Sequence, residues 1–214
     1  MVDILQNYTR SLCWFRRDLR DFDHAALFYA LKHSQQVFAV FVFDQAILAD
    51  LPATDKRIAF IWQSVAELKA ALQQRGGDLI VLHAAAVSAI PQLAQQLAVQ
   101  AVFCNHDYEP AAMARDAEIA QILEQNQQVL HTFKDQVIFE RAEIVKANGT
   151  PYAVFTPYKK AWLAKLNDFY MKSYPVAPYW KNLAPIQTAS LLPSLSALGF
   201  APNGLESLGV VGGM

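Results

Sequence analysis

Five short apolar runs, separated by longer stretches of mixed polarity, dominate the first 133 residues and restrict the folds open to this chain. A continuously apolar run of this length is typical of a strand that is buried on both faces of a parallel sheet. The intervals between the runs are long enough for crossover helices. The expected strands are residues 12–15, 37–43, 79–83, 101–105 and 128–133.

Two of the intervals have clear helical patterns. Residues 55–75 are followed at once by Gly76-Gly77, which is a helix stop, and residues 110–126 begin with Pro110 at the first helical position. Regular alternation of strand and helix predicts a Rossmann-like α/β domain over residues 1–133, with a five-stranded parallel sheet and helices on both faces. The expected buried helix positions are Ile58, Ile61, Trp62, Val65, Leu68 and Leu72, then Ala112, Ile119, Ile122 and Leu123.

The pattern stops after Phe133, and residues 134–214 are expected to form an interdomain connector. A short strand and a turn at Asn148-Gly149 are expected within residues 135–150. A helix is then predicted with Thr156 as N-cap and Pro157 as its first residue. From Tyr170 onward recurrent prolines favour an extended segment that lies along a surface. We expect the aromatic side chains of this connector to leave an exposed apolar patch. The helix residues expected to pack are Tyr158, Trp162, Leu163 and Leu166.

Composition narrows the class of protein. Of the 214 residues, 54% are hydrophobic and 17% charged, which argues for a folded core and against disorder. No apolar run reaches the roughly 18 residues that span a bilayer, and no secretion signal is visible at the start. The two cysteines, Cys13 and Cys104, lie in apolar segments and are expected to be buried and reduced, as in a cytoplasmic protein.

Ligands of an open parallel sheet bind beyond the carboxyl ends of its strands. The segment that follows the first strand runs from Arg16 to Asp21 and contains no glycine, which argues against a nicotinamide dehydrogenase. A phosphate-binding loop of the GxxxxGK[ST] type is absent as well. No nucleophile motif occurs, and the five histidines lack metal-ligand spacing, so neither a catalytic residue nor a metal site is predicted.

The segment after the fourth strand, Asn105-His106-Asp107-Tyr108-Glu109, gathers polar groups just before a helix. These groups are able to hydrogen-bond a heteroaromatic ligand with N–H donors. Alternatively, Asp107 and Glu109 only complement the helix dipole. Arg115, on the following helix, either forms a buried ion pair with a carboxylate or contacts a ligand. The net charge of −1 offers no basic face for nucleic acid, so contact with DNA is expected to come mainly from elsewhere.

Several motifs in order resemble the photolyase and cryptochrome family. The opening resembles WFRRDLRxxDHxAL, and similarity continues through FVFD at residues 41–44, Arg57-Ile58, the Asn105–Glu109 segment and YAVFTPY at residues 152–158. The resemblance covers roughly residues 11–200 and is closest to a bacterial member of the class I type.

The resemblance implies a two-domain flavoprotein in which a C-terminal helical domain holds FAD and the DNA lesion. The N-terminal α/β domain would carry an antenna chromophore, either a reduced folate such as methenyltetrahydrofolate, or a deazaflavin or FMN. By the same resemblance, Asn105 and Glu109 would bind the pterin of a folate. A buried antenna would instead be held by Arg16, Phe43, Asp44, Arg57 and Asp107.

The flavin domain is not found in these residues, so the chain alone is expected to be inactive in DNA repair. Damaged DNA and the chain's own flavin domain would be its partners, and neither a membrane nor a metal is expected. Two alternatives stay open: part of a cryptochrome-type photosensor, and a standalone module that binds a small molecule or nucleotide.

Overall fold

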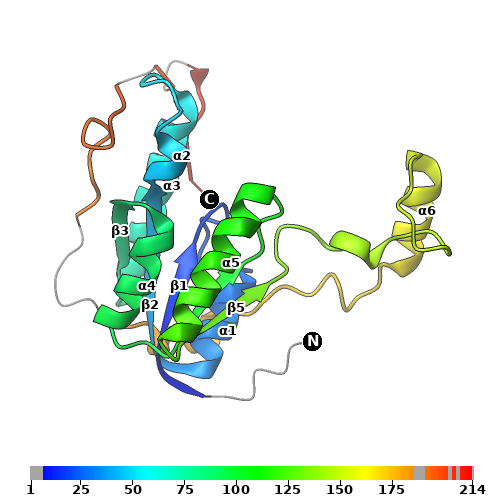
Figure 1. The fold of residues 1–214 in the computed structure, drawn as a ribbon, viewed down its shortest axis with the longest axis horizontal. Helices are drawn as coiled ribbons and strands as arrows, with labels where there is room; N and C mark the ends of the chain where they lie inside the picture. Colours follow the sequence, from blue (N-terminus) through cyan, green and yellow to red (C-terminus); the bar gives the residue numbers. More distant parts are fainter. Residues whose placement is uncertain (1–6, 186–190, 202–203, 206–207, 214) are drawn as a thin grey trace.

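A five-stranded parallel sheet forms the centre of the computed structural model, which describes residues 7–185, 191–201, 204–205 and 208–213. The strand order is β3-β2-β1-β4-β5, and every neighbouring pair is parallel. This confirms the predicted α/β architecture (Figure 1). The strands are β1 (Tyr8–Phe15), β2 (Ser34–Asp44), β3 (Leu79–Ala84), β4 (Ala101–Asn105) and β5 (Val129–Phe133).

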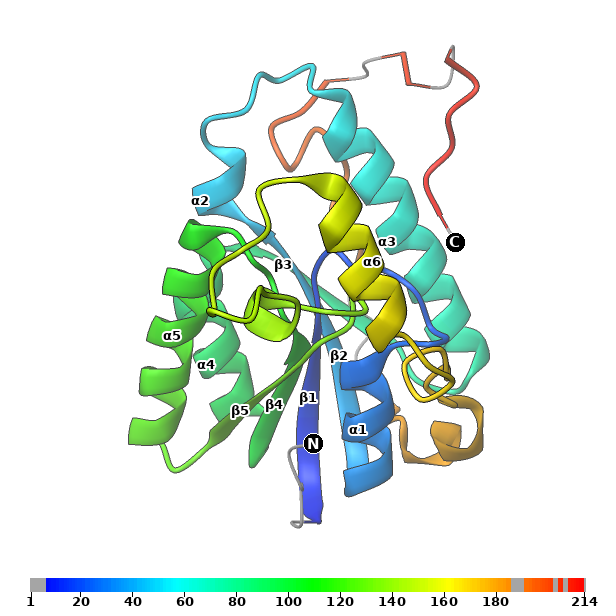
Figure 2. The same ribbon diagram turned by 90° about the vertical axis from the view of Figure 1, so that its right-hand side faces the viewer.

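Helices cover both faces of the sheet, as the alternating pattern predicts (Figure 2). One face packs against α1 (Ala25–His33) and α3 (Lys56–Gln74), whose buried side chains share a core with Phe15, Phe41 and Phe103. The other face packs against α4 (Ala86–Gln96) and α5 (Pro110–Gln125), around Trp14 and Val40. A short helix, α2 (Gln45–Leu48), follows β2 directly.

Helix α3 ends where the glycine pair predicts. The Gly77 N–H donates to the Leu72 carbonyl at 3.1 Å, the Gly76 N–H donates to the Gln73 carbonyl at 3.0 Å, and Gly76 has a φ of +90°. These bonds form a Schellman motif, which needs a left-handed residue that glycine adopts without strain. At Gly77 a Cβ would lie 2.4 Å from Leu183 Cγ, so this glycine also lets the returning chain pack closely.

Residues 134–175 leave the sheet after β5 and form an arm that projects from the α/β body (Figure 1). The arm contains a single 3-10 turn, η1 (Arg141–Glu143), and the helix α6 (Phe155–Lys165). Residues 134–154, all of which are described, form no strand, so the short strand expected there is wrong. The turn at Asn148-Gly149 is confirmed: Gly149 has a φ of +79°, and its N–H donates to the Lys146 carbonyl at 2.8 Å.

The predicted start of α6 is wrong by two residues. Val154 is the N-cap, and no side chain caps the helix, so Thr156 and Pro157 are its second and third residues. Proline is tolerated there because the first N–H groups of a helix have no intrahelical partner. No side chain of α6 is fully buried, because the arm holds this helix away from the body.

A small aromatic cluster holds the arm together. The buried Phe139 ring lies 5.4 Å from Trp162 and 4.7 Å from Tyr170, measured between ring centroids. Lys165 Nζ lies over the Phe139 ring and donates to the Glu143 carbonyl at 2.7 Å. The rest of the arm exposes apolar side chains, among them Leu163, which was expected to pack; that they form one continuous patch stays a prediction. These exposed side chains include Val154, Phe155, Leu163, Phe169 and Met171.

The chain returns to the body through η2 (Ala177–Asn182) and adds to the core. Leu183 forms an isolated parallel β-bridge with Val37 of β2, and the Ala184 N–H donates to the Val37 carbonyl at 2.8 Å. Leu198 and Phe200 are buried in the core cluster of the α1 and α3 face. The returning segment therefore completes the α/β core, which the expectation of a surface connector did not include.

Both cysteines are free and fully buried, as expected, on adjacent central strands. Burial raises the pKa of the Cys104 thiol to about 12 and raises that of Cys13 well above its usual value. We expect neither thiol to react with a disulfide reagent at pH 8 while the protein is folded, and both to react in denaturant, because the thiolate is the nucleophile. A thiol titration with and without urea checks this; rapid reaction of the folded protein would contradict the buried positions.

Candidate functional site

The strand order reverses at β1, which lies between β2 on one side and β4 on the other. The carboxyl edge of the sheet at such a switch point is where open α/β sheets bind ligands. Three sequence-predicted segments meet there: the loop after β1 from Arg16 to His24, Asp44 at the end of β2, and the loop after β4 from His106 to Glu109. Within the described residues, every helix is too short or too polar to traverse a bilayer.

Arg16 is a nearly buried side chain that joins β1, β4 and α5. One guanidinium nitrogen contacts both carboxylate oxygens of Asp116, at 2.8 and 2.7 Å. The other nitrogen donates to the backbone carbonyl of Asn105. Hydrogen bonds between two charged groups are shorter and stronger than those between neutral groups. Arg16 thus fixes the loop after β1 against α5, as well as lying at the predicted site.

Asp18 and His24 form a buried pair with Asn105. Asp18 Oδ2 lies 3.1 Å from His24 Nε2 and accepts from Asn105 Nδ2 at 2.5 Å, while Asp18 Oδ1 accepts the Arg16 N–H at 2.8 Å. His24 Nδ1 accepts from the Leu27 N–H at 3.0 Å, which caps α1. Burial alone would raise the pKa of Asp18, but His24 and these hydrogen bonds together lower it far below its usual value.

The Asn105 side chain takes part in this network through both ends of its amide. Its amide oxygen accepts the Ala26 N–H at 2.9 Å, and its amide nitrogen faces Asp18 and His24. Both ends of the buried side chain are engaged inside the protein, so Asn105 joins β4 to the start of α1. Other residues of the loop after β1 have structural partners too: Arg20 pairs with Asp135 at 2.7 Å.

Arg17 forms ion pairs with both Asp107 and Glu109. Its guanidinium lies 3.1 Å from Asp107 Oδ2 and 2.6 Å from Glu109 Oε1. The Glu109 side chain is 65% exposed, whereas that of Asp107 is nearly buried. Asp107 Oδ1 also accepts the Glu109 N–H at 3.2 Å. Glu109 is the N-cap residue of α5 but makes no side-chain capping bond, so its carboxylate faces outward beside Arg17.

Asp44 and Arg115 approach each other over Trp14. Asp44 Oδ1 accepts two backbone N–H groups, at 3.2 Å from Ala46 and 3.3 Å from Ala86. Asp44 Oδ2 lies 3.8 Å from Arg115, which is an ion pair without a direct hydrogen bond. The guanidinium carbons of Arg16 and Arg115 lie 4.8 and 5.0 Å from the Trp14 ring centroid. Arg115 also donates to Asp116 Oδ1 from Nε at 3.2 Å and from Nη2 at 3.1 Å, which confirms the ion-pair alternative for Arg115.

Two predicted residues lie apart from this group. Phe43 is buried in the core of the α1 and α3 face, with its ring centroid 4.9 Å from that of Phe41. Arg57 is in the first turn of α3, where its guanidinium contacts Asp55 and is 72% exposed. The described contacts place neither side chain against Arg16, Asp107 or Glu109.

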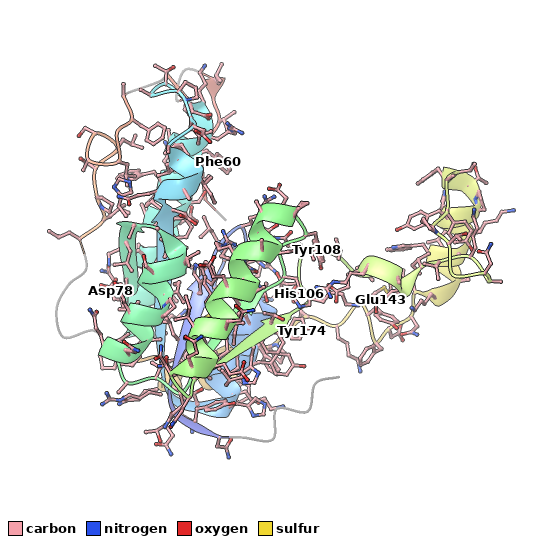
Figure 3. All side chains as sticks on the ribbon, viewed as in Figure 1. Phe60, Asp78, His106, Tyr108, Glu143 and Tyr174 are labelled. Carbon is pink, nitrogen blue, oxygen red and sulfur yellow. The ribbon has the colours of Figure 1, made fainter. Side chains whose placement is uncertain are left out.

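A further cluster is built around Glu140, a residue that no sequence motif singled out. Glu140 Oε2, on the arm, lies 2.7 Å from His106 Nδ1 and accepts the Tyr108 hydroxyl at 2.7 Å. Figure 3 places His106 and Tyr108 at the root of the arm and Glu143 farther out. Burial and Glu140 raise the pKa of Tyr108. Burial alone would raise the pKa of Glu140, but the bonds from Tyr108 and His106 lower it. No local pattern links residues more than 30 positions apart.

Comparison with known proteins agrees with this geometry. The DNA photolyase family profile matches residues 11–179. The chain is 34% identical over 202 residues to a deoxyribodipyrimidine photo-lyase of Synechococcus sp. PCC 6301, covering 90% of this chain and 41% of that one. It is also 34% identical to an uncharacterized 31.6 kDa protein of Synechococcus sp. PCC 6716, with 92% and 69% covered.

Solved structures give the same result. A bacterial class III photolyase from Agrobacterium tumefaciens superposes with a TM-score of 0.74 at 25% identity, covering 92% of this chain and 39% of that one. An archaeal photolyase from Sulfolobus tokodaii, solved with two FAD molecules, gives 0.65 at 26% identity, with 74% and 35% covered. This chain thus spans about two fifths of the length of these photolyases. It belongs to the DNA photolyase family and corresponds to the N-terminal α/β domain of its members.

Proposed function

We propose that this chain is the antenna-carrying half of a deoxyribodipyrimidine photolyase of the class I type. When bound, the antenna, a reduced folate such as methenyltetrahydrofolate or else a deazaflavin or FMN, absorbs light and passes the excitation to FAD, which drives repair of pyrimidine dimers. FAD and the damaged DNA would be held by a helical partner domain. The α/β half supplies placement and no catalytic residue, and by itself it is inactive in repair. It works in the cytoplasm.

The gap between Asp44 and Arg115 is the observation that supports an antenna here. A carboxylate oxygen and a guanidinium lie side by side, 3.8 Å apart, too far for a mutual hydrogen bond. Arg115 Nε and Nη2 already donate to Asp116 Oδ1, so it is Arg115 Nη1 and Asp44 Oδ2 that keep hydrogen-bonding capacity for a ligand. Pterin and flavin rings present an N–H next to a carbonyl, and this edge matches an acceptor beside a donor. Backbone bonds to Asp44 Oδ1 hold the carboxylate in place before any ligand arrives.

The proposed roles of the other predicted residues follow from the exposure and the contacts of their side chains. Glu109 and Asp107, paired with Arg17, present carboxylates at the rim and are proposed to contact the antenna directly. Arg16 is proposed to position the rim by holding Asp116 of α5. Asn105, whose amide is engaged on both sides, is proposed to act through the loop it anchors. Arg57 is proposed to contact only a ligand that extends past Asp44 toward α3, and the buried Phe43 is proposed to support the end of β2 from within the core.

Titration of the chain with methenyltetrahydrofolate and with FMN, followed by ligand fluorescence anisotropy, tests this proposal. We expect saturable binding of one of them, and a Kd that rises by about tenfold in Arg115→Ala and in Asp44→Asn, because each variant removes a charged hydrogen-bonding group. Arg10→Ala, which removes an exposed guanidinium at the start of β1, should leave the Kd unchanged. Equal affinities in all variants, or no binding of either chromophore, would refute the proposal.

A standalone binding module is the second candidate, and the 31.6 kDa relative favours it, since this chain spans 69% of that protein. The mass of the native protein in its source cells separates the two. A mass about twice 23.9 kDa, with bound flavin, supports the repair enzyme. A native mass of 23.9 kDa without flavin supports the module. Light-dependent loss of pyrimidine dimers in the native preparation then distinguishes a repair enzyme from a cryptochrome-type sensor.

A further inference from the structure

A polar cleft of about 310 Å³ lies at the amino end of the sheet, whereas the proposed antenna site lies at the carboxyl ends of the strands. It is formed where β1 begins, where α1 passes into β2, and where η2 ends. Among the residues that the structure describes, no Asp or Glu lines this cleft. Its cationic or titratable lining residues are Lys32, His33 and Lys181, and its amides include Asn7 and Asn182.

The two lysines of the cleft differ from the eight basic residues of this chain that form ion pairs. Arg16, Arg17, Arg20, Arg57, Arg75, Arg115, Lys69 and Lys134 all contact carboxylates. Within the described part of the chain, neither Lys32 nor Lys181 forms an ion pair. Lys32 Nζ lies 5.4 Å from the Phe28 ring centroid instead. The cleft thus concentrates uncompensated positive charge on a chain whose net charge is −1.

Basic residues near a helix C-terminus usually complement the helix dipole. That explanation covers Lys32 and His33, which are in the last turn of α1. It does not cover Lys181, which comes from η2, about 150 residues later in the sequence. Moreover, Asn182 Nδ2 already donates to the Leu31 carbonyl at 2.8 Å, so an amide satisfies this end of the helix.

Ser34 provides an independent observation. Its side chain lines the cleft and is only 5% exposed, and among the described residues its Oγ has no hydrogen-bond partner. Buried hydroxyls nearly always have a partner, and an unpartnered one costs about 1–3 kcal/mol. A hydroxyl donor in a cleft that is also lined by two lysines is suited to the oxygen atoms of an anion.

We infer that this cleft binds the phosphate group of a small phosphorylated molecule, with Lys32 and Lys181 as charged donors and Ser34 Oγ as the buried donor. The cleft has room for a phosphate together with part of the group that carries it. Nucleic acid is a poorer match, because binding along a backbone requires a basic face that reaches several phosphates, and here the charge is confined to one cleft.

Titration of the full chain with inorganic phosphate, pyrophosphate and AMP, followed by NMR amide shifts at constant ionic strength, tests this inference. We expect saturable shifts centred on residues 32–35 and 181–182. Lys32→Gln and Lys181→Gln should each weaken binding by about tenfold, since each removes one charge-assisted hydrogen bond. Lys146→Gln, which removes an exposed lysine on the arm, should leave the affinity unchanged.

Ser34→Ala separates a ligand donor from a structural hydroxyl. Because Ser34 Oγ has no partner within the described protein, its loss should leave urea stability unchanged or raise it, while weakening phosphate binding by about threefold. A stability loss with unaltered binding would overturn the assignment of Ser34 Oγ as a donor. Shifts that are equal in wild type, the lysine variants and Lys146→Gln would overturn the site, as would binding of duplex DNA without binding of any small phosphate.

Discussion

Asp18→Asn should destabilise the folded chain by about 3–5 kcal/mol at pH 7, because hydrogen bonds to a charged group contribute about 1.5–3 kcal/mol each and a buried donor left unpaired is costly. The replacement leaves an amide where three donors converge: the Arg16 N–H, Asn105 Nδ2 and His24 Nε2. The His24 ring is held in place, because its Nδ1 accepts the Leu27 N–H. Urea unfolding, followed by circular dichroism, measures the loss.

The pH dependence identifies the carboxylate as the cause. The folded-state pKa of Asp18 is lowered, so its stabilisation is present above its unfolded pKa of about 3.9 and is lost as the pH falls toward the folded value. The difference between wild type and Asp18→Asn should therefore be constant from pH 7 to 5 and shrink below about pH 4. Asp50→Asn, at an exposed position, should stay within about 0.5 kcal/mol of wild type. A difference that does not vary with pH would show that the charge of Asp18 is not the stabilising feature.

The same contacts explain why the opening motif was a good guide to fold and family, while the ligand contacts that it implies stay a prediction. Arg16, Asp18 and His24 have partners on β4, α1 and α5, so much of the motif encodes how the loop after β1 is held. A family resemblance does not distinguish a residue that touches a ligand from one that positions its neighbour. Asn105 lies at the predicted edge and its amide is engaged internally, so a role in positioning the neighbouring loop is the one its contacts support.

The strands and the long helices were predictable because burial imposes a regular apolar period on them. The arm was not, because its contacts are few and distant in sequence. Glu140 meets His106 across 34 positions, and α6 starts at Phe155 without a capping side chain. No sequence pattern indicated that Leu183 packs against Gly77. This close contact requires a glycine, which the sequence pattern explained only as a helix stop.

Phe139→Ala should unfold the arm while leaving the α/β body folded. Removing a buried phenylalanine typically costs about 3–5 kcal/mol. The arm has little else to offset such a loss, because Phe139 is the centre of its aromatic cluster with Trp162 and Tyr170. The sheet has separate cores on its two faces, and neither contains this ring. Hydrogen exchange should therefore become fast over residues 155–165 and remain slow in β1, β2 and β4.

Phe155→Ala is the matched control, since it deletes the same ring from the same arm at a position that is 73% exposed. It should leave exchange in α6 close to that of wild type, because surface substitutions usually change stability by less than about 0.5 kcal/mol. Equal acceleration in both variants would mean that the Phe139 cluster does not hold the arm. Loss of protection in the central strands of Phe139→Ala would mean that arm and body unfold as one cooperative unit, contrary to the separate cores seen in the structure.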